Sequence, residues 1–198
     1  MQYEEALKLG DRLGKTLSIG ITKDGEPGNI IGVPWVATSH AFNMRTPDVY
    51  IAPADLQDET LMGFIGRCKV IGFYIFEPLE DYSFLAGYKD LEDLNIYNGD
   101  ALRSVDFLKE LPELRMLYIE NAVLPELNAL VTIKKERRSI LSTLRCVGLC
   151  NCRVGDLSAF EGADISFSEF LVWNPRDRDE RQRWQVVKAH TRRYYELK

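Results

Sequence analysis

A short apolar pattern that returns along the chain constrains the fold more than any other feature. Residues 91–98 read L-x-x-L-x-I-x-N, and residues 114–121 repeat that pattern in full. Residues 144–151 keep it with Val and Leu at two positions, residues 167–174 follow it loosely, and shorter copies precede them at 70–75 and 49–51. One such unit is too small to bury its own apolar side, so successive copies must stack on one another.

The spacing of these copies is that of a stacked-repeat protein. The second apolar strand residues are Ile51, Ile75, Ile96, Ile119, Leu149 and Val172, which lie 24, 21, 23, 30 and 23 positions apart. If each copy is a strand, alternate side chains point to opposite faces of a parallel sheet. The pairs expected to face the core are Phe73/Ile75, Leu94/Ile96, Leu117/Ile119, Val147/Leu149 and Phe170/Val172.

A second motif follows every strand except the last. Two apolar residues six positions apart enclose acids or hydroxyls, as in the segment 79–85. The pairs are Leu56/Met62, Leu79/Leu85, Leu102/Leu108, Leu124/Leu130 and Val154/Phe160. Apolar residues then recur at every third position up to the next strand, which is the period of a 3₁₀ helix. We therefore expect short 3₁₀ or irregular returns between the strands.

Together these motifs resemble the leucine-rich repeat family, in its short class of roughly 22-residue repeats seen in internalins and phosphatase-regulatory leucine-rich proteins. The resemblance covers residues 48–174 and is closest over 91–130. It implies an α/β fold class: a leucine-rich repeat solenoid with a parallel concave sheet and short 3₁₀ or irregular convex segments. An α/β cap is expected at the N-terminal end and a helical cap at the C-terminal end.

The asparagines that end the repeats depart from the family in their position. The family places its ladder Asn three residues after the last strand leucine, whereas Asn98, Asn121, Asn151 and Asn174 come two residues after it. We therefore expect these side chains to cap turns or to line the rim of the sheet instead of forming a buried ladder.

The flanking sequences fit the two caps of one structural domain: residues 1–47 as an N-terminal α/β capping segment, 48–174 as leucine-rich repeats, and 175–198 as a C-terminal capping helix. Within the first cap we expect a helix over 2–13 and a hairpin over 17–37. In the second, Trp184, Val187, Thr191 and Tyr194 have helical spacing, which predicts a helix over about 179–195. The long repeat before Leu149 carries a basic run at 134–138, expected as an exposed convex excursion for which a helical turn is one possible form.

Charge is unevenly distributed along the chain. The formal net charge is −5, but residues 175–198 hold eight Lys or Arg against four acids, which leaves −9 on the rest. An acidic body repels phosphate backbones, so we expect no nucleic acid partner. Salt-sensitive binding of the basic tail to a membrane surface remains a possible alternative. Neither a membrane span nor a secretory signal is recognisable, which favours a cytoplasmic location.

Patterns for catalysis, nucleotides and metals are weak. Residues 10–16 have three residues between two glycines where a phosphate-binding loop needs four, so a helix end is the simpler interpretation. Cys146, Cys150 and Cys152 lie along or beside one strand and do not provide four ligands in a loop, so we expect small strand residues. We predict no catalytic residues, no metal site, no cofactor and no small-molecule substrate.

An enzyme is the competing hypothesis. His40 lies beside Ser39 and close to Asn43 in the N-terminal segment, and the repeats would then serve as a scaffold. The other histidine, His190, lies among arginines near the C-terminus, where a solvated position is the simpler interpretation. We expect neither histidine to be catalytic.

The remaining candidate is the concave face. Alternation along the strands turns large aromatic and acidic side chains outward, and such a group on a solvent-facing sheet is typical of a protein-binding site. The resemblance likewise implies recognition of another macromolecule, usually a protein, without catalysis. A flanking segment covering this face is the alternative. The predicted partner-binding residues are Tyr74, Phe76, Asp93, Asn95, Tyr97, Met116, Tyr118, Glu120, Glu169 and Trp173.

Overall fold

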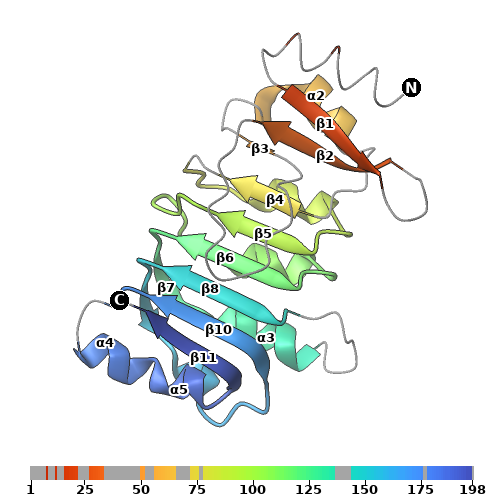
Figure 1. Ribbon diagram of the computed structural model, residues 1–198. Helices are drawn as coiled ribbons and strands as arrows, with labels where there is room; N and C mark the ends of the chain where they lie inside the picture. The colour runs from red at the N-terminus through yellow and green to blue at the C-terminus, as the bar shows by residue number, and fades with distance from the viewer. Residues whose placement is uncertain are drawn as a thin grey trace.

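The computed structural model describes residues 8, 12, 16–21, 27–33, 50–51, 56–65, 72–75, 78–136, 144–175 and 178–197. Within these ranges the chain is mixed α/β, with a parallel seven-stranded sheet, two smaller sheets and short helices (Figure 1). The α/β class expected from the sequence is confirmed.

The seven-stranded sheet follows chain order from one edge to the other. Its strands are β3 (Tyr50–Ile51), β4 (Gly72–Ile75), β5 (Asp93–Ile96), β6 (Met116–Glu120), β8 (Cys146–Cys150), β10 (Phe167–Trp173) and β11 (Thr191–Leu197). The register places the six positions used to measure the repeat spacing side by side, from Ile51 to Val172. Each repeat therefore contributes one parallel strand in the same alignment.

The core lies beneath this sheet and is filled by the predicted inward residues. All five pairs from Phe73/Ile75 to Phe170/Val172 are at most 2% exposed. The apolar ends of the following motif complete the core, because every pair from Leu79/Leu85 onward is also buried. Alternation in the strands and the six-residue spacing in the returns thus correctly identify the two layers of one core.

The returns between strands contain short helices. They form the 3₁₀ helices η2 (Ser83–Gly87), η3 (Asp106–Glu110) and η4 (Ser158–Phe160), with α2 (Glu59–Ile65) and α3 (Asn128–Glu136) at the equivalent places of two other repeats. In the first, the N–H groups of Leu85, Tyr88 and Leu91 donate to the carbonyls of the residues three positions earlier, at 3.1, 2.9 and 3.1 Å. The predicted 3₁₀ period is therefore present in the hydrogen bonds themselves.

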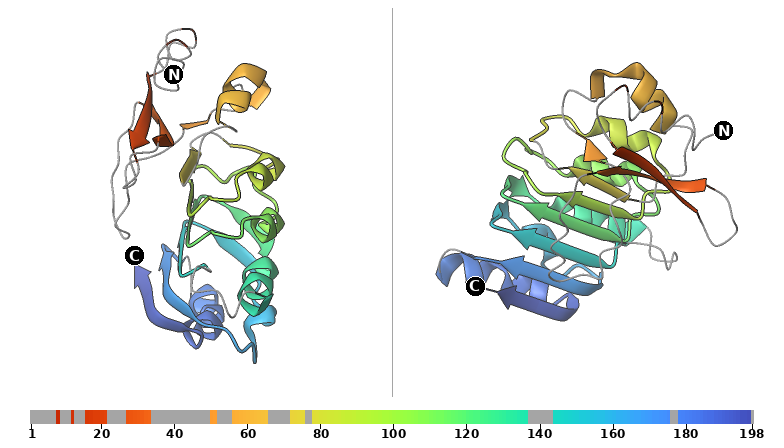
Figure 2. Two further views of the ribbon diagram at one scale, coloured as in Figure 1. Left: turned by 90° about the vertical axis from the view of Figure 1, so that its right-hand side faces the viewer. Right: turned by 45° about the horizontal axis from the view of Figure 1, so that its top comes forward.

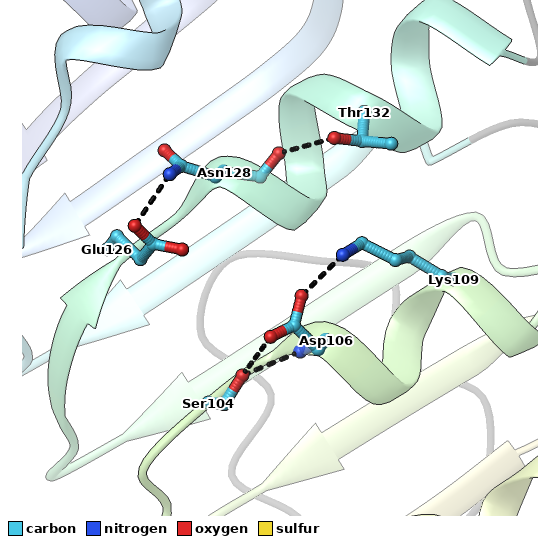
Figure 3. Close-up of polar contacts among 6 residues, drawn as sticks. All are labelled: Ser104, Asp106, Lys109, Glu126, Asn128 and Thr132. Atoms are coloured by element: carbon cyan, nitrogen blue, oxygen red, sulfur yellow. Dashed lines mark hydrogen bonds and ion pairs between the residues drawn. The ribbon is translucent and has the colours of Figure 1, made fainter.

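Polar side chains start these returns. Asp81 accepts from the backbone N–H and the hydroxyl of Ser83, at 2.8 and 2.9 Å, and Asp156 accepts from Ser158 at the same distances. These bonds hold the pKa of both carboxyls below the usual range. Before η3 the order is reversed, since the Ser104 hydroxyl accepts from the Asp106 N–H at 3.0 Å and donates to its carboxylate at 2.8 Å (Figure 3).

Three asparagines turn the chain at the carboxyl ends of the strands. Asn121, Asn151 and Asn174 have positive φ values of 60°, 51° and 56°, a region that asparagine tolerates better than most residues. Asn151 donates its amide to Asn121 at 3.3 Å, and Asn174 donates to Asn151 at 2.9 Å. The ladder exists, but it runs along the rim of the sheet as predicted.

A small parallel sheet joins two neighbouring repeats beyond that rim. It consists of β7 (Val123–Glu126) and β9 (Arg153–Asp156). The strands approach so closely that a Cβ added to Gly155 would lie 2.6 Å from the Pro125 carbonyl oxygen. Glycine at 155 is thus a packing requirement of this second sheet.

The C-terminal segment differs from the predicted single helix. It forms α4 (Arg178–Arg183) and α5 (Gln185–Lys188), and then returns as strand β11 beside β10. Trp184 and Val187 are buried, so the helical spacing was correct up to this point. Beyond it, the Thr191 hydroxyl donates to the Val187 carbonyl at 2.8 Å, and pairing with β10 continues the chain as a strand.

The basic run in the long repeat is also less exposed than expected. Lys134 lies in the last turn of α3, where its ammonium donates to the Leu144 carbonyl at 3.1 Å and lies 5.2 Å from the centre of the Phe167 ring. Burial lowers the pKa of this lysine. Lys135 is exposed, whereas Arg137 and Arg138 lie outside the described residues.

At the N-terminal end, β1 (Thr16–Ile21) and β2 (Pro27–Val33) form an antiparallel pair, which confirms the hairpin. The hairpin lies near β3, on the opposite side of the large sheet from α3 (Figure 2). Apart from Lys8 and Arg12, the predicted helix over 2–13 lies outside the described residues, as does most of the glycine-containing segment 10–16.

Candidate functional site

The predicted site lies on the front face of the seven-stranded sheet, defined here as the face turned away from the 3₁₀ returns and α3 (Figure 2). The strand register arranges its side chains in three rows. The amino-end row is Asp93, Met116, Cys146, Glu169 and Arg193; the middle row is Tyr74, Asn95, Tyr118, Gly148, Leu171 and Tyr195. The carboxyl-end row is Glu120, Cys150, Trp173 and Leu197, with Tyr97 following β5.

Eight of the ten predicted residues are therefore brought together on one face. Tyr74 belongs to the same face by register, opposite Asn95, but its side chain lies outside the description. Phe76 lies outside the described residues altogether. Alternation along the strands was sufficient to group these residues, because the strands pair without an offset.

Three positions of the middle row are closed to solvent, contrary to the open face that the sequence suggested. Asn95 is 1% exposed and Leu171 is 3% exposed, and Gly148 between their strands is buried as well. Within the described part of the protein, neither the amide nitrogen nor the oxygen of Asn95 has a hydrogen-bond partner. A buried amide without partners destabilises the folded state, so this position is costly to keep polar.

Tyr97 and Glu120 of the carboxyl-end row form a compact aromatic and acidic cluster with Tyr118 of the middle row. The rings of Tyr97 and Tyr118 have their centres 5.6 Å apart and are inclined by 50°. The Tyr118 hydroxyl donates to a Glu120 carboxylate oxygen at 3.3 Å. All three side chains are half-buried, so each keeps some surface accessible. We call these three residues the tyrosine cluster.

Electrostatics suit the tyrosine cluster to binding more than to proton transfer. Burial and the nearby Glu120 charge raise the pKa of Tyr97 to about 12. Burial, followed by Cys150 and Glu120, also raises the pKa of Tyr118. Both phenols are therefore protonated near neutral pH and present hydroxyl donors. They do not provide the base that acid or base catalysis requires near that pH.

The amino-end row is partly neutralised. Arg193 donates to a Glu169 carboxylate oxygen at 2.8 Å. Glu169 is therefore less able to repel an acidic partner, because an arginine already balances its charge. This pair was not foreseen, since Arg193 was predicted in a helix and instead occupies β11.

The three described cysteines are free thiols. Burial raises the pKa of Cys146 to about 11 and that of Cys152 to about 12, so both are protonated and weakly reactive near neutral pH. The Cys152 thiol donates to the Ile119 carbonyl at 3.4 Å. Across the described ranges, no three His, Cys, Asp or Glu side chains gather in a way that could hold a metal ion.

A separate hollow of about 520 Å³ lies by the small sheet and was not predicted. It is lined by both strands of that sheet and by Glu180 and Arg183 of α4. The Arg183 guanidinium donates to the carbonyls of Val154 and Gly155, at 3.2 and 3.3 Å, and so caps the outer edge of β9. The polar groups of this hollow therefore hold α4 against the edge of β9.

The competing catalytic hypothesis concerns Ser39, His40 and Asn43, which lie outside the described residues. His190 is half-buried at the turn into β11, where its carbonyl accepts from the Phe167 N–H at 2.8 Å. Of the helices that the structure describes, none has the length and apolar character needed to cross a membrane.

The front face also contains residues that the sequence did not identify as part of the site. Gly148, Arg193, Tyr195 and Leu197 complete its rows, the last three because β11 joins the sheet. Thr191, Tyr194 and Tyr195 were the available signal, because β-branched and aromatic residues favour strands. Neither a protein-family model, nor a curated protein, nor a solved structure matches this chain, and the site is therefore interpreted from its own geometry.

Proposed function

We propose that this protein is a non-catalytic binding module, built as a leucine-rich repeat solenoid, that recognises a protein partner through the tyrosine cluster on its front face. The observation that carries this proposal is the tyrosine cluster, in which two half-buried aromatic rings lie next to an acceptor carboxylate. Tyrosines of this kind offer a large apolar surface together with a hydroxyl, and they are enriched at binding hot spots.

Three features support the solenoid part of the proposal. The parallel strands follow chain order in one alignment, the returns contain short 3₁₀ or α-helices, and three asparagines form a ladder from repeat to repeat. Proteins of this architecture bind partners over extended surfaces made by several repeats. The rows across the front face have that arrangement, since the repeats of β5, β6, β8, β10 and β11 each contribute one residue to every row, Tyr97 being the residue that follows β5.

The partner is expected to be neutral or basic. Asp93 and Glu120 lie on the front face, and the chain outside the basic C-terminal segment carries a charge of −9. Acidic partners would be repelled and basic ones attracted at long range. Asn95 and Leu171 are buried and therefore cannot contact a partner. The proposed contact is made by Tyr97, Tyr118 and Glu120.

The test is affinity capture from cells of the native host, followed by titration of the captured protein in purified form. Wild type is compared with Tyr97→Ala/Tyr118→Ala. We expect the double variant to weaken binding by roughly 30-fold or more, because two anchor side chains together contribute about 2 kcal/mol or more. Glu120→Gln should weaken binding mainly at low salt, if the partner is basic.

A matched control removes exposed side chains elsewhere. Val123→Ala/Arg153→Ala changes two neighbouring residues of the small sheet and should leave affinity unchanged. Circular dichroism and thermal unfolding must show that each variant is folded. Equal affinity of wild type and the tyrosine double variant for every captured protein would refute binding through the tyrosine cluster.

A further inference from the structure

Strand β11 ends the seven-stranded sheet and pairs only with β10 among the described strands. Its seven residues make it as long as the longest strand of the sheet, and five of them are exposed. About half of the backbone N–H and C=O groups of an edge strand face away from the sheet, ready to pair with another strand. This edge is therefore long, regular and accessible.

The edge also carries unusual apolar exposure. Among the described residues, the large apolar side chains that are exposed are Val123, Tyr195 and Leu197, and two of these three belong to β11. Tyr195 is 46% and Leu197 is 38% exposed. Natural edge strands are commonly protected by charges, proline or a covering segment. Exposed apolar side chains on such an edge are what a strand-pairing interface requires.

The sequence of β11 is complementary to itself in the antiparallel direction. When Tyr194 is placed opposite Tyr194 of a second copy, Arg192 faces Glu196 and Arg193 faces Tyr195. Two opposite-charge pairs result, and no like charges are directly opposed. In the described part of the single chain Arg192 has no ion pair, whereas Glu196 binds Arg181 of α4 at 3.1 Å.

We propose that two copies of this protein associate through antiparallel pairing of their β11 strands, centred on Tyr194. The two seven-stranded sheets then become one continuous sheet, and each Arg192 meets Glu196 of the partner subunit on the side where Arg181 already lies. On the other side of the sheet, Tyr195 packs against the stem of Arg193 of the partner subunit. The front faces of both copies lie on one extended sheet, so the dimer offers two binding surfaces.

The test is sedimentation equilibrium of the full chain from about 1 µM to about 1 mM, the range in which small interfaces associate. Wild type should dimerise. Arg192→Glu places like charges opposite Glu196 twice in the dimer and should weaken association by roughly tenfold or more. The double variant Arg192→Glu/Glu196→Arg reverses both charges and should restore most of it. Arg153→Glu, on β9, is the charge-matched control and should dimerise like wild type.

A cross-linking experiment fixes the register independently. In the proposed pairing the two residues at position 194 are directly opposed, at a Cα separation that allows a disulfide. Tyr194→Cys should therefore form a covalent dimer on mild oxidation, while Val123→Cys on the small sheet should not. A monomeric wild type throughout the concentration range, an undiminished Arg192→Glu dimer, or no covalent dimer of Tyr194→Cys would each overturn the proposal.

Discussion

Asn95 lies in the middle of the front face, 1% exposed, and its amide finds no hydrogen-bond partner among the described residues. Leucine has nearly the same shape and no polar atoms to leave unpaired. Asn95→Leu should therefore raise the free energy of unfolding by about 1 kcal/mol, measured by urea denaturation. Asn95→Asp buries a charge and should lower it. A less stable Asn95→Leu protein would mean that the amide is hydrogen-bonded after all.

Asn151 is the central member of the rim ladder, and it has a φ of 51°. Its side chain donates to Asn121 and accepts from Asn174. Asn151→Ala loses both bonds and replaces asparagine by a residue that tolerates positive φ less well, which should cost about 1–3 kcal/mol. Asn151→Gly loses only the bonds, so its stability should fall between those of wild type and the alanine variant. The reverse order in chemical denaturation would contradict this account.

The tyrosine cluster predicts a loss of stability in alkaline solution. The pKa of Tyr97 is about 12 in the folded protein, and about 10 is usual for an unfolded chain. Between these values the folded state binds more protons than the unfolded state, so stability falls as the pH rises. Tyr97→Phe should show a smaller fall between pH 8 and pH 11 in urea denaturation, with pH values chosen to span the onset of this window. An identical slope would show that Tyr97 does not contribute.

At the scale of the elements, the small sheet depends on close contact between β7 and β9. A Cβ at Gly155 would meet the Pro125 carbonyl oxygen at 2.6 Å, whereas one at Gly87, in η2, would meet nothing within 4 Å. Gly155→Ala should therefore lower the free energy of unfolding by about 1–3 kcal/mol. Gly87→Ala is the control and should raise stability slightly, by up to about 1 kcal/mol. Similar effects of the two substitutions would disprove the packing argument.

Strands and returns could be predicted because their apolar residues have different periods. Alternation identified Phe73 through Val172 as inward or outward, and the three-residue period identified the 3₁₀ returns. Strand β11 could not be predicted in the same way. Trp184 and Val187 have the helical spacing that suits the segment of α4 and α5. Thr191 and Tyr194 continue this spacing by coincidence, although they lie in β11, whose sequence lacks the leucine pattern of the other strands.

For the candidate site, alternation grouped the residues correctly but did not reveal their environment. The pattern along one strand carries no information on what lies over it, so the burial of Asn95 was not foreseen. The ion pair between Arg193 and Glu169 was missed for a related reason, since it depends on β11 joining the sheet. Contacts between repeats depend on which residues of neighbouring strands lie side by side. That register was predictable only for strands with a clear leucine pattern.

At the scale of the whole molecule, α4 and α5 close the C-terminal end of the core. Trp184 is 1% exposed, and its ring centre lies 5.9 Å from that of Phe170. Trp184→Ala should cost about 3–5 kcal/mol. Each strand pairs only with its neighbours, so the effect of this substitution should be local. In Trp184→Ala, deuterium exchange should be accelerated, relative to wild type, more for the amides of β10 and β11 than for those of β5 and β6. Equal acceleration in all four strands would show that the molecule unfolds only as one unit.

The repeat with α3 shows which part of the molecule can vary in length. Its strand spacing is 30 residues, against 21 to 24 in the others, and Ile119 still pairs directly with Leu149. The added residues are accommodated in the return and leave the strand alignment unchanged. Over evolutionary time, insertions and deletions should therefore accumulate in the returns, behind the sheet. The spacing of side chains on the front face should stay constant, so that single substitutions there can alter the choice of partner.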